Sequence, residues 1–473
     1  MLADAAQHLD RHRSTCCDNV LSTADQQFKC LDDFCQKILT IVESESLWRQ
    51  KSNTNLMTLL RLYYSKEATD PRDKIYGLLG LVRDWGHIKP ITPDYSVSVA
   101  QLYQETAMRS IAVTKKFECL TYRADSEVSR NAMQFNELVQ NVKMGLAYYN
   151  QLPPEADYMQ KYLKEEVMKK GKPDPIEIPF SSWAPNWAKI NEIPYATSVT
   201  DRMNRALAFD ACGGRSASEP RMLYTASPVL SRSAVLTASA MRVGKVGQFS
   251  HNMRAGRGTT MMPFLVNSMA TISEKEFPLP LNPDEEDMEP YVAGGTRYEA
   301  LCRAVCGDTF FASHSNSAGR NGVSMFRRAT VDDLESIRLW RKWLFKSKHK
   351  SAGYKPPNPE DFEDQDDYQR ALEANRAIRS IGVQRRFIVL DSGHVGMAPL
   401  AMAEDVIVIL MGASTPVVLR PLGDIEVEEV GIQTLWIVVG ECYLVGAMDG
   451  ELLEQVEKQG KQLETQLETF YLV

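Results

Sequence analysis

His394 is the residue whose type and setting first suggest chemistry. It lies three residues after Asp391 in a Gly-His-Val-Gly turn, where the carboxylate could orient the imidazole as a base. No serine or cysteine with a nucleophile signature accompanies this pair, and an isolated histidine in a turn is more often structural. The sequence therefore identifies no catalytic residue.

Two charged clusters could instead bind ions. Arg72, Asp73 and Lys74 stand at an expected helix start, where backbone N–H groups attract phosphate, although helix capping explains the same residues. Near the other end of the chain, acidic side chains could surround a cation. Interleaved apolar residues favour a strand and a tight turn with solvated acids there. The candidate cation ligands are Glu441, Cys442, Asp449 and Glu451.

The spacing of cysteine and histidine residues does not match a structural metal site. The nine cysteines are scattered and odd in number, which is typical of reduced thiols. No close group has the paired Cys-x-x-Cys arrangement of a zinc site. Gly77 and Gly80 follow no expected strand and so form no dinucleotide fingerprint. We therefore expect no metal and no cofactor. The groups considered are His8, His12 and Cys16, Cys30 and Cys35, and Cys302 and Cys306.

Length and composition narrow the class of protein. The 473 residues are 44% hydrophobic and 24% charged, as in ordinary globular proteins of two or three domains. The 54 basic and 61 acidic residues give a net charge of −7, which argues against a nucleic-acid partner. The sequence contains no apolar run of membrane-spanning length and no export signal, so we expect no membrane span and a cytoplasmic location.

Helices are expected to position the first charged cluster. Asp70 is placed to cap a helix that starts at Pro71 and continues to Val82. Ser98 and Gln101 form the capping box of the next helix. Before both, apolar residues spaced by three and four predict an amphipathic helix; they are Leu56, Leu59, Leu60 and Tyr63.

The last third of the chain predicts a sheet. Runs rich in β-branched residues span 386–391, 405–411, 416–420 and 434–440, separated by turn residues. Short strands at such spacing predict a mostly antiparallel small β-barrel or sandwich. A strand pattern also starts near Leu223, residues 331–345 predict a buried helix, and the segment from Glu451 begins as a helix. The fold class is therefore expected to be α+β, with helices before the sheet.

Composition shifts divide the chain into three expected regions. Residues 1–120 are mainly helical, and residues 121–200 form a helical excursion with a connector that buries Trp183 and Trp187. Residues 201–473 form a β-rich domain with loop and helix insertions at about 250–380. The proline-rich, charged stretches 278–290 and 346–367 are expected to be loops.

Taken together, these segments resemble the fungal heterokaryon incompatibility (HET) domain family. Ala68-Thr-Asp-Pro-Arg-Asp-Lys-Ile-Tyr-Gly-Leu-Leu-Gly80 is similar to that family's helix entry, and Ser182-Trp-Ala-Pro-Asn-Trp187 to its Ser-Trp-x-Pro-x-Trp segment. Several elements in order are more specific than one motif. The resemblance implies these motif residues, which we expect to be structural: Asp70, Pro71, Arg72, Asp73, Tyr76, Asp94, Tyr95, Trp183, Pro185, Trp187, Gly396, Pro399, Asp405, Gly412, Arg420, Gly440, Glu441, Tyr443, Asp449, Gly450 and Glu451.

The chain departs from the family pattern in two places. The family's opening Tyr-Xaa-Xaa-Leu-Ser-Tyr-Xaa-Trp-Gly pattern and its Asp-Ala-Ile-Cys-Ile-Asn-Gln segment are absent, so the resemblance implies a chain that lacks the N-terminal half of the HET domain. The N-terminal helices would then be the remnant of an α/β HET core. Glu404 replaces the glycine usual before Asp405, which suggests a turn that needs no left-handed residue.

The resemblance implies a role in fungal non-self recognition, in which HET domains provoke vegetative incompatibility and cell death. A truncated interaction or signalling protein without catalysis of its own is the expected form, acting through an unidentified protein partner. Self-association is a further expectation, because uncovered helix faces promote it. One alternative is a TIR-like NAD-cleaving core whose catalytic half is missing here. A second alternative is an inactive paralogue.

Overall fold

The computed structural model describes most of the last two thirds of the chain and part of the first. The described residues are 54–63, 66–122, 175–178, 181–188, 205–250, 288–312, 326–346, 357–382 and 385–473, with positions 38, 42, 45, 138–139 and 141–142. The cysteine and histidine groups before residue 36, and most of the expected helical excursion, lie outside them. The chain divides into two units, residues 1–96 with 312–325, and residues 97–311 with 326–473.

The first unit carries the two expected helices, but the second is shorter than predicted. α4 (Leu56–Tyr63) buries most of its apolar residues, as the spacing indicated. The helix expected from Pro71 to Val82 is instead α5 (Asp73–Tyr76), followed by the 3-10 turn η1 (Leu79–Leu81). Gly77 and Gly80 explain the break, since glycine is among the weakest helix formers. Leu81, the last residue of η1, is exposed.

The second unit begins with a helix whose start was predicted correctly. α6 (Val99–Thr114) starts at Ser98, and the reciprocal hydrogen bonds between Ser98 and Gln101 form the capping box. The helix ends at Lys115, whose φ of 56° closes the last turn. The short η2 (Glu118–Tyr122) follows, and Phe117 N–H donates to Gly412 O, which joins this segment to the sheet.

A nine-stranded sheet forms the centre of the second unit. Its order is β10-β6-β5-β2-β11-β9-β8-β7, with β1 paired to β2. All pairs are antiparallel except β9 with β11. The strands are β1 (Met222–Tyr224), β2 (Ala234–Phe249), β5 (Arg385–Leu390), β6 (Val395–Pro399), β7 (Val406–Leu410), β8 (Val417–Val427), β9 (Gly431–Glu441), β10 (Tyr443–Leu444) and β11 (Leu467–Leu472).

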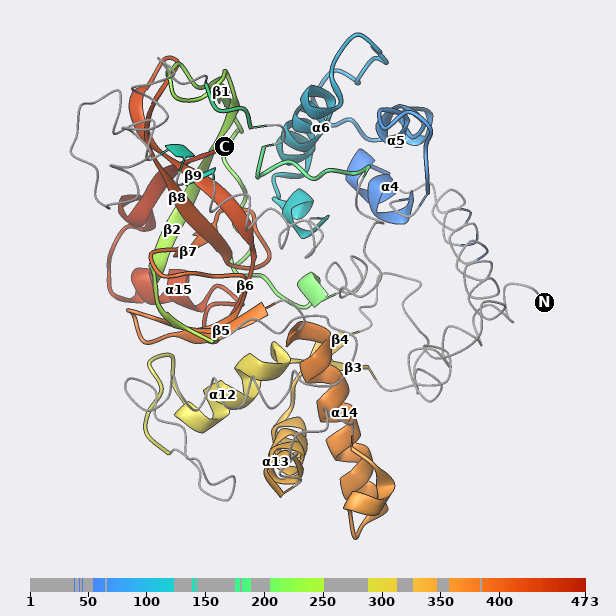
Figure 1. Cartoon of the computed structure of the whole chain (residues 1–473), viewed down its shortest axis with the longest axis vertical. Coiled ribbons are helices and arrows are strands. Elements are labelled where there is room, and N and C mark those ends of the chain that lie inside the picture. Colours follow the sequence, from blue (N-terminus) through green and yellow to red (C-terminus); the bar gives the residue numbers. More distant parts are fainter. Residues whose placement is uncertain are drawn as a thin grey trace, which may run out of the picture. The chain divides into compact units, whose positions relative to one another are not determined.

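The predicted α+β class with a mostly antiparallel sheet is confirmed, but the sheet as a whole is not a closed barrel. β2 is long and pairs with β11, β7 and β5 along its length. Irregular register at Arg242/Gly244 and Val246/Gln248 bends it between these partners. Strands β2, β7, β8, β9 and β11 thus pair in a ring, while β5, β6 and β10 extend the sheet beyond it (Figure 1).

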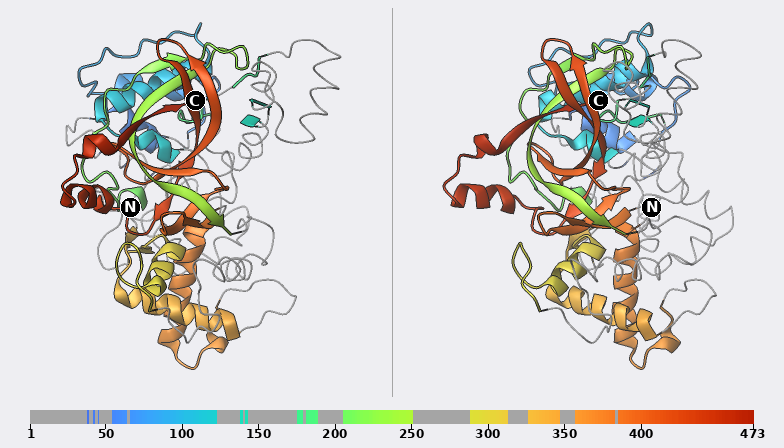
Figure 2. Two further views of the ribbon diagram at one scale, coloured as in Figure 1. Left: turned by 90° about the vertical axis from the view of Figure 1, so that its left-hand side faces the viewer. Right: turned by 60° about the vertical axis from the view of Figure 1, so that its left-hand side comes forward.

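Three helices pack beside the extension formed by β5 and β6. α12 (Arg297–Cys306), α13 (Val331–Lys346) and α14 (Gln365–Gly382) share one apolar cluster with Phe387 and Val389 of β5 and Met397 of β6. Figures 1 and 2 show the three helices together at this end of the sheet. The small hairpin of β3 (Thr309–Phe311) and β4 (Phe326–Arg328) lies among them. The helix expected over 331–345 is therefore present.

Two local features differ from the sequence-based expectations. Glu404 has a φ of 72°, so the turn before β7 does use a left-handed residue, and the expectation from the missing glycine was wrong. Glutamate holds this conformation because the turn is fixed around it: Asp405 N–H donates to Met402 O, and Met402 N–H to Asp405 Oδ2. In addition, the chain after α15 (Glu451–Lys458) returns to the sheet as β11.

Candidate functional site

Asp308 is the centre of a charged site at the end of α12. The helix starts with a capping box between Thr296 and Glu299 and stops at Gly307, whose φ is 58°. Asp308 follows with a φ of 50°, a conformation that aspartate tolerates better than most residues. This turn carries the Asp308 carboxylate inward, and the residue is only 1% exposed.

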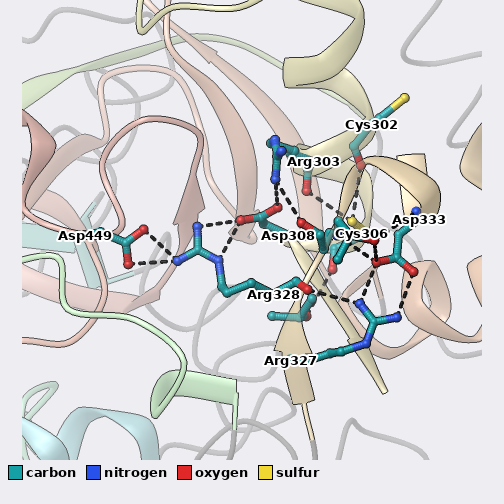
Figure 3. Close-up of polar contacts among 11 residues, drawn as sticks. Cys302, Arg303, Cys306, Asp308, Arg327, Arg328, Asp333 and Asp449 are labelled. Carbon is teal, nitrogen blue, oxygen red and sulfur yellow. Dashed lines mark hydrogen bonds and ion pairs between the residues drawn. The ribbon is translucent and has the colours of Figure 1, made fainter. Parts of the chain in front are cut away.

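Two arginines bind the Asp308 carboxylate and connect it to a third segment. Arg303, one helical turn earlier, forms an ion pair with Oδ1, and Arg328 Nε donates to Oδ2 at 2.7 Å. Arg328 Nη1 also reaches both carboxylate oxygens of Asp449, at 2.8 and 2.6 Å. Figure 3 shows Arg328 between the two aspartates. The arrangement links α12, β4 and the turn before α15; we call Arg303, Asp308, Arg328 and Asp449 the arginine–aspartate network.

Arg327, the neighbour of Arg328 on β4, binds a different carboxylate. Its guanidinium contacts both oxygens of Asp333 at 2.5 and 2.9 Å (Figure 3). Thr330 N–H donates to the same carboxylate at 2.7 Å. Burial raises the pKa of Asp333, but the hydrogen bonds from Arg327 and Thr330 outweigh it and hold the pKa below its ordinary value. Of these two adjacent arginines, Arg327 therefore binds the start of α13, and Arg328 binds the aspartates of the network.

The thiols and the phenol beside the network stay protonated near neutral pH. Burial raises the pKa of the Cys306 thiol, and the Asp308 carboxylate acts in the same direction. Burial likewise raises the pKa of Tyr443 well above its ordinary value and that of Cys442 to about 12. A thiol needs its thiolate form to act as a nucleophile. These groups therefore contribute packing and polarity rather than nucleophiles.

A small cavity lies next to the network. Arg205, on its wall, donates from Nε to Thr309 Oγ1 at 2.9 Å, and Thr309 directly follows Asp308. Arg385 and Glu441 stand on the wall too, with 3.6 Å between Nη2 and Oε1. The cavity is partly open and offers about 20 Å³, which is room for one or two water-sized groups.

The motif residues of the first unit come together in one polar cluster. Arg72 pairs with Asp70 at 2.8 Å and donates to the backbone O of Tyr95. The Tyr95 hydroxyl donates to Asp73 at 2.5 Å, while Tyr76 donates its hydroxyl to Asp94 O at 2.8 Å. The hydrogen bonds from Arg72 hold the pKa of Asp70 below its ordinary value. Pro71 lies inside the turn so formed. The Arg72 guanidinium, which the sequence offered as a phosphate ligand, pairs with Asp70 instead.

The tryptophan connector is buried in the second unit. Trp183, Pro185 and Trp187 are all buried, and Trp187 packs edge-on against Tyr103 of α6 with ring centroids 5.1 Å apart. The neighbouring Ser182 hydroxyl accepts a hydrogen bond from Val438 N–H of β9 at 2.8 Å. The connector therefore fixes α6 against the sheet, as buried aromatic residues often do.

Most motif residues of the last third contact one another. Gly396 lies so close to Tyr443 that an added Cβ would stand 2.0 Å from its carbonyl oxygen, and a Cβ on Gly440 would meet Pro399 at 2.9 Å. Asp405 pairs with Arg420, and Glu441 faces Arg385. A Cβ on Gly412, whose φ is 92°, would meet Lys115 O at 2.6 Å.

The carboxylates considered for a cation face other partners. Glu451 Oε2 accepts a hydrogen bond from Asp449 N–H at 2.6 Å. Gly450, between them, has a φ of 81° and precedes the first residue of α15. The Asp449 side chain binds Arg328. His394 likewise lies beside Ser392, with 3.0 Å between Nδ1 and Oγ, while Asp391 accepts from Lys245 N–H. Burial lowers the pKa of His394. The structure therefore does not pair Asp391 with His394 as a base.

The centre of the network was not predicted from the sequence. Asp308, Arg303 and Arg328 belong to no motif that was singled out, and Arg205 and Arg385 on the cavity wall were missed as well. The available signal was Gly307-Asp308 directly after an amphipathic helix, followed later by the adjacent pair Arg327-Arg328. Within the part of the chain that the structure describes, no helix has the length and apolar character to cross a membrane.

Comparison with known proteins supports the resemblance seen in the motifs. Residues 289–464 match the family described as the Het-6 beta-barrel domain. The matched residues include the whole arginine–aspartate network and the cavity wall, except the part of the wall at residues 205–209. β1, β2 and β11 lie outside the match, although they complete the sheet. No solved structure matches the chain.

A curated relative gives the second similarity. The chain is 23% identical over 428 residues to the heterokaryon incompatibility protein 6, OR allele, of Neurospora crassa. The alignment covers 86% of this chain and 51% of that protein, so the chain spans about half the length of the relative. Together, the two similarities support the resemblance of the chain to fungal heterokaryon incompatibility (HET) proteins.

Proposed function

We propose that the chain is an interaction and signalling component of fungal non-self recognition, linked to cell death and without catalysis of its own. The observation that carries the proposal is the Het-6 beta-barrel match over residues 289–464, together with the similarity to an incompatibility protein of N. crassa. We place the contact with a protein partner in this matched region.

The arginine–aspartate network supports a contact of this kind. Asp308 is buried, but Arg328 and Asp449 keep 39% and 42% of their side chains exposed. Polar groups that are half exposed and already oriented by a buried partner suit the rim of a protein interface, where they set register and specificity. The neighbouring thiols remain protonated, which supports binding rather than nucleophilic catalysis.

Inducible expression in hyphae of a filamentous fungus tests the proposed role. One strain would express the chain alone, and a second would express it joined behind the N-terminal half of the N. crassa relative. We expect growth arrest and uptake of a vital dye in the second strain only. Normal growth of the fusion strain would contradict the incompatibility role, and death caused by the chain alone would contradict its dependence on an upstream half.

One test variant and one matched control sharpen this experiment. A fusion with Asp308→Asn removes the central charge of the network and should lose toxicity, whereas a fusion with Arg221→Gln changes only an exposed ion pair with Glu429 and should stay toxic. Equal protein levels on a blot are required for both. For catalysis, purified chain would be incubated with NAD; steady release of nicotinamide, abolished by unfolding, would overturn the non-catalytic part of the proposal.

A further inference from the structure

Arg385 is a buried guanidinium with very few hydrogen bonds. The residue is 6% exposed, yet of its five N–H groups only one, on Nη1, donates within hydrogen-bond distance among the described residues, to Glu441 O at 3.0 Å. The Glu441 carboxylate stands 3.6 Å from Nη2, which is beyond a hydrogen bond. The other side-chain N–H groups have no acceptor within hydrogen-bond distance among the described residues, and a charged donor is costly unless water or a ligand reaches it.

The cavity described above lies directly beside this guanidinium. Its wall carries two positive charges, Arg205 and Arg385, and one negative charge, Glu441. The Thr415 hydroxyl adds a polar group, and the remaining wall is largely apolar: Ala206, Phe209, Ile381, Cys442, Tyr443 and Met448. Apolar walls strengthen the attraction between a buried cation and an anion because they lower the local dielectric constant.

Size, charge and geometry limit what can fill the cavity. About 20 Å³ is room for one or two water-sized groups, which suits the oxygens of a planar carboxylate. The guanidinium groups of Arg205 and Arg385 on the wall attract an anion. Guanidinium donors lie in a planar fork that matches a carboxylate. We propose that this cavity binds the carboxylate group of a ligand through Arg385.

The binding step follows from the observed distances. The incoming oxygens would accept from the Arg385 N–H groups that face the cavity, while Nη1 keeps its bond to Glu441 O. The Glu441 side chain opposes the ligand by charge and so sets its affinity. The acidic side chain of a protein and a free small carboxylate share this chemistry, and the experiment separates them.

Thermal unfolding of the purified full chain in acetate tests the site, with sodium chloride used to keep the ionic strength constant. We expect a saturable rise in Tm with acetate and none with chloride alone. Arg385→Gln should lose this rise. Arg232→Gln, which changes an exposed arginine paired with Glu428, should keep it.

A second variant keeps the test decisive if Arg385→Gln does not fold. Glu441→Gln removes the opposing charge and should tighten acetate binding by roughly tenfold, a direction that a damaged fold cannot produce. Circular dichroism would verify that each variant is folded. The proposal would be overturned if acetate left the Tm of the wild type unchanged or raised it without saturation. Equal acetate affinity in the wild type and Glu441→Gln would also overturn it.

Two peptides then identify the source of the carboxylate. An amidated hexapeptide with one central glutamate would be titrated calorimetrically against the same peptide with glutamine. Tighter binding of the glutamate peptide than of acetate, lost in Arg385→Gln, indicates a protein side chain as the ligand. Acetate binding without peptide binding assigns the site to a free small carboxylate, and binding of neither overturns it.

Discussion

The guanidinium of Arg420 and the carboxylate of Asp405 form a bidentate ion pair inside the sheet, with Nε–Oδ1 and Nη2–Oδ2 distances of 2.8 Å each. The two side chains are 6% and 1% exposed. Arg420 Nη2 also donates to Leu400 O at 3.1 Å, so the pair joins β8 to the turn between β6 and β7. Both residues belong to the motif on which the family resemblance rests.

Replacing Asp405 by asparagine should destabilise the protein strongly. The change keeps the shape but removes the carboxylate that the buried Arg420 charge faces, which costs about 3–5 kcal/mol in comparable pairs. Urea unfolding followed by circular dichroism would measure the loss. Arg221→Gln breaks an exposed pair and should cost at most about 1 kcal/mol. Equal effects of the two changes would show that the Asp405 pair does not stabilise the sheet.

The two aspartates of the network should respond differently to the same substitution. Asp308→Asn leaves Arg303 and Arg328 facing a neutral buried group and should lower the free energy of unfolding by about 3 kcal/mol. Asparagine accepts the positive φ of this position, so the charge alone is tested. Asp449→Asn affects a half-exposed pair and should cost less than about 1 kcal/mol. The reverse order would contradict the central place of Asp308.

Adding one methyl group at Gly396 should be poorly tolerated. A Cβ there would stand 2.0 Å from Tyr443 O and 3.0 Å from Leu444 Cα, both backbone atoms of β10. Gly396→Ala must therefore move β6 away from β10 and should cost about 1–3 kcal/mol or more. Gly80→Ala, where a Cβ meets nothing within 4 Å, serves as the control in the same denaturation experiment. If Gly396→Ala left the free energy of unfolding unchanged, β6 and β10 would be able to move apart at little cost.

The sequence predicted the features that depend on neighbouring residues. The capping box of Ser98 and Gln101 and the strands β5 and β7 follow from local patterns, and the structure has them. β11 was not predicted, because its main partner is β2, far earlier in the chain. The network was missed for the same reason, since Arg328 and Asp449 are 121 residues apart and only the fold brings them together.

The pH dependence of stability should contain a contribution from His394. Burial lowers the pKa of His394 in the folded protein below its unfolded value near 6.5. The unfolded chain therefore binds the proton more readily, so this contribution is complete above pH 6.5 and is lost as the pH falls through the folded pKa. Urea midpoints measured from pH 8 to pH 5 should fall less for His394→Asn than for wild type. If the urea midpoints of wild type and His394→Asn fell equally with pH, His394 would be excluded as a source of the pH dependence.

Glu404 offers a test of backbone strain in isolation. Its φ of 72° is unfavourable for a residue with a Cβ and normal for glycine. Its side chain contacts Lys245 at 3.0 Å, but the glutamate is 73% exposed, so losing this pair costs little. Glu404→Ala removes the pair and keeps the Cβ, whereas Glu404→Gly removes both. The glycine variant should be more stable than the alanine variant by about 1 kcal/mol in urea unfolding, because only glycine relieves the strain. Equal free energies of unfolding for the glycine and alanine variants would show that the turn holds no strain for glycine to relieve.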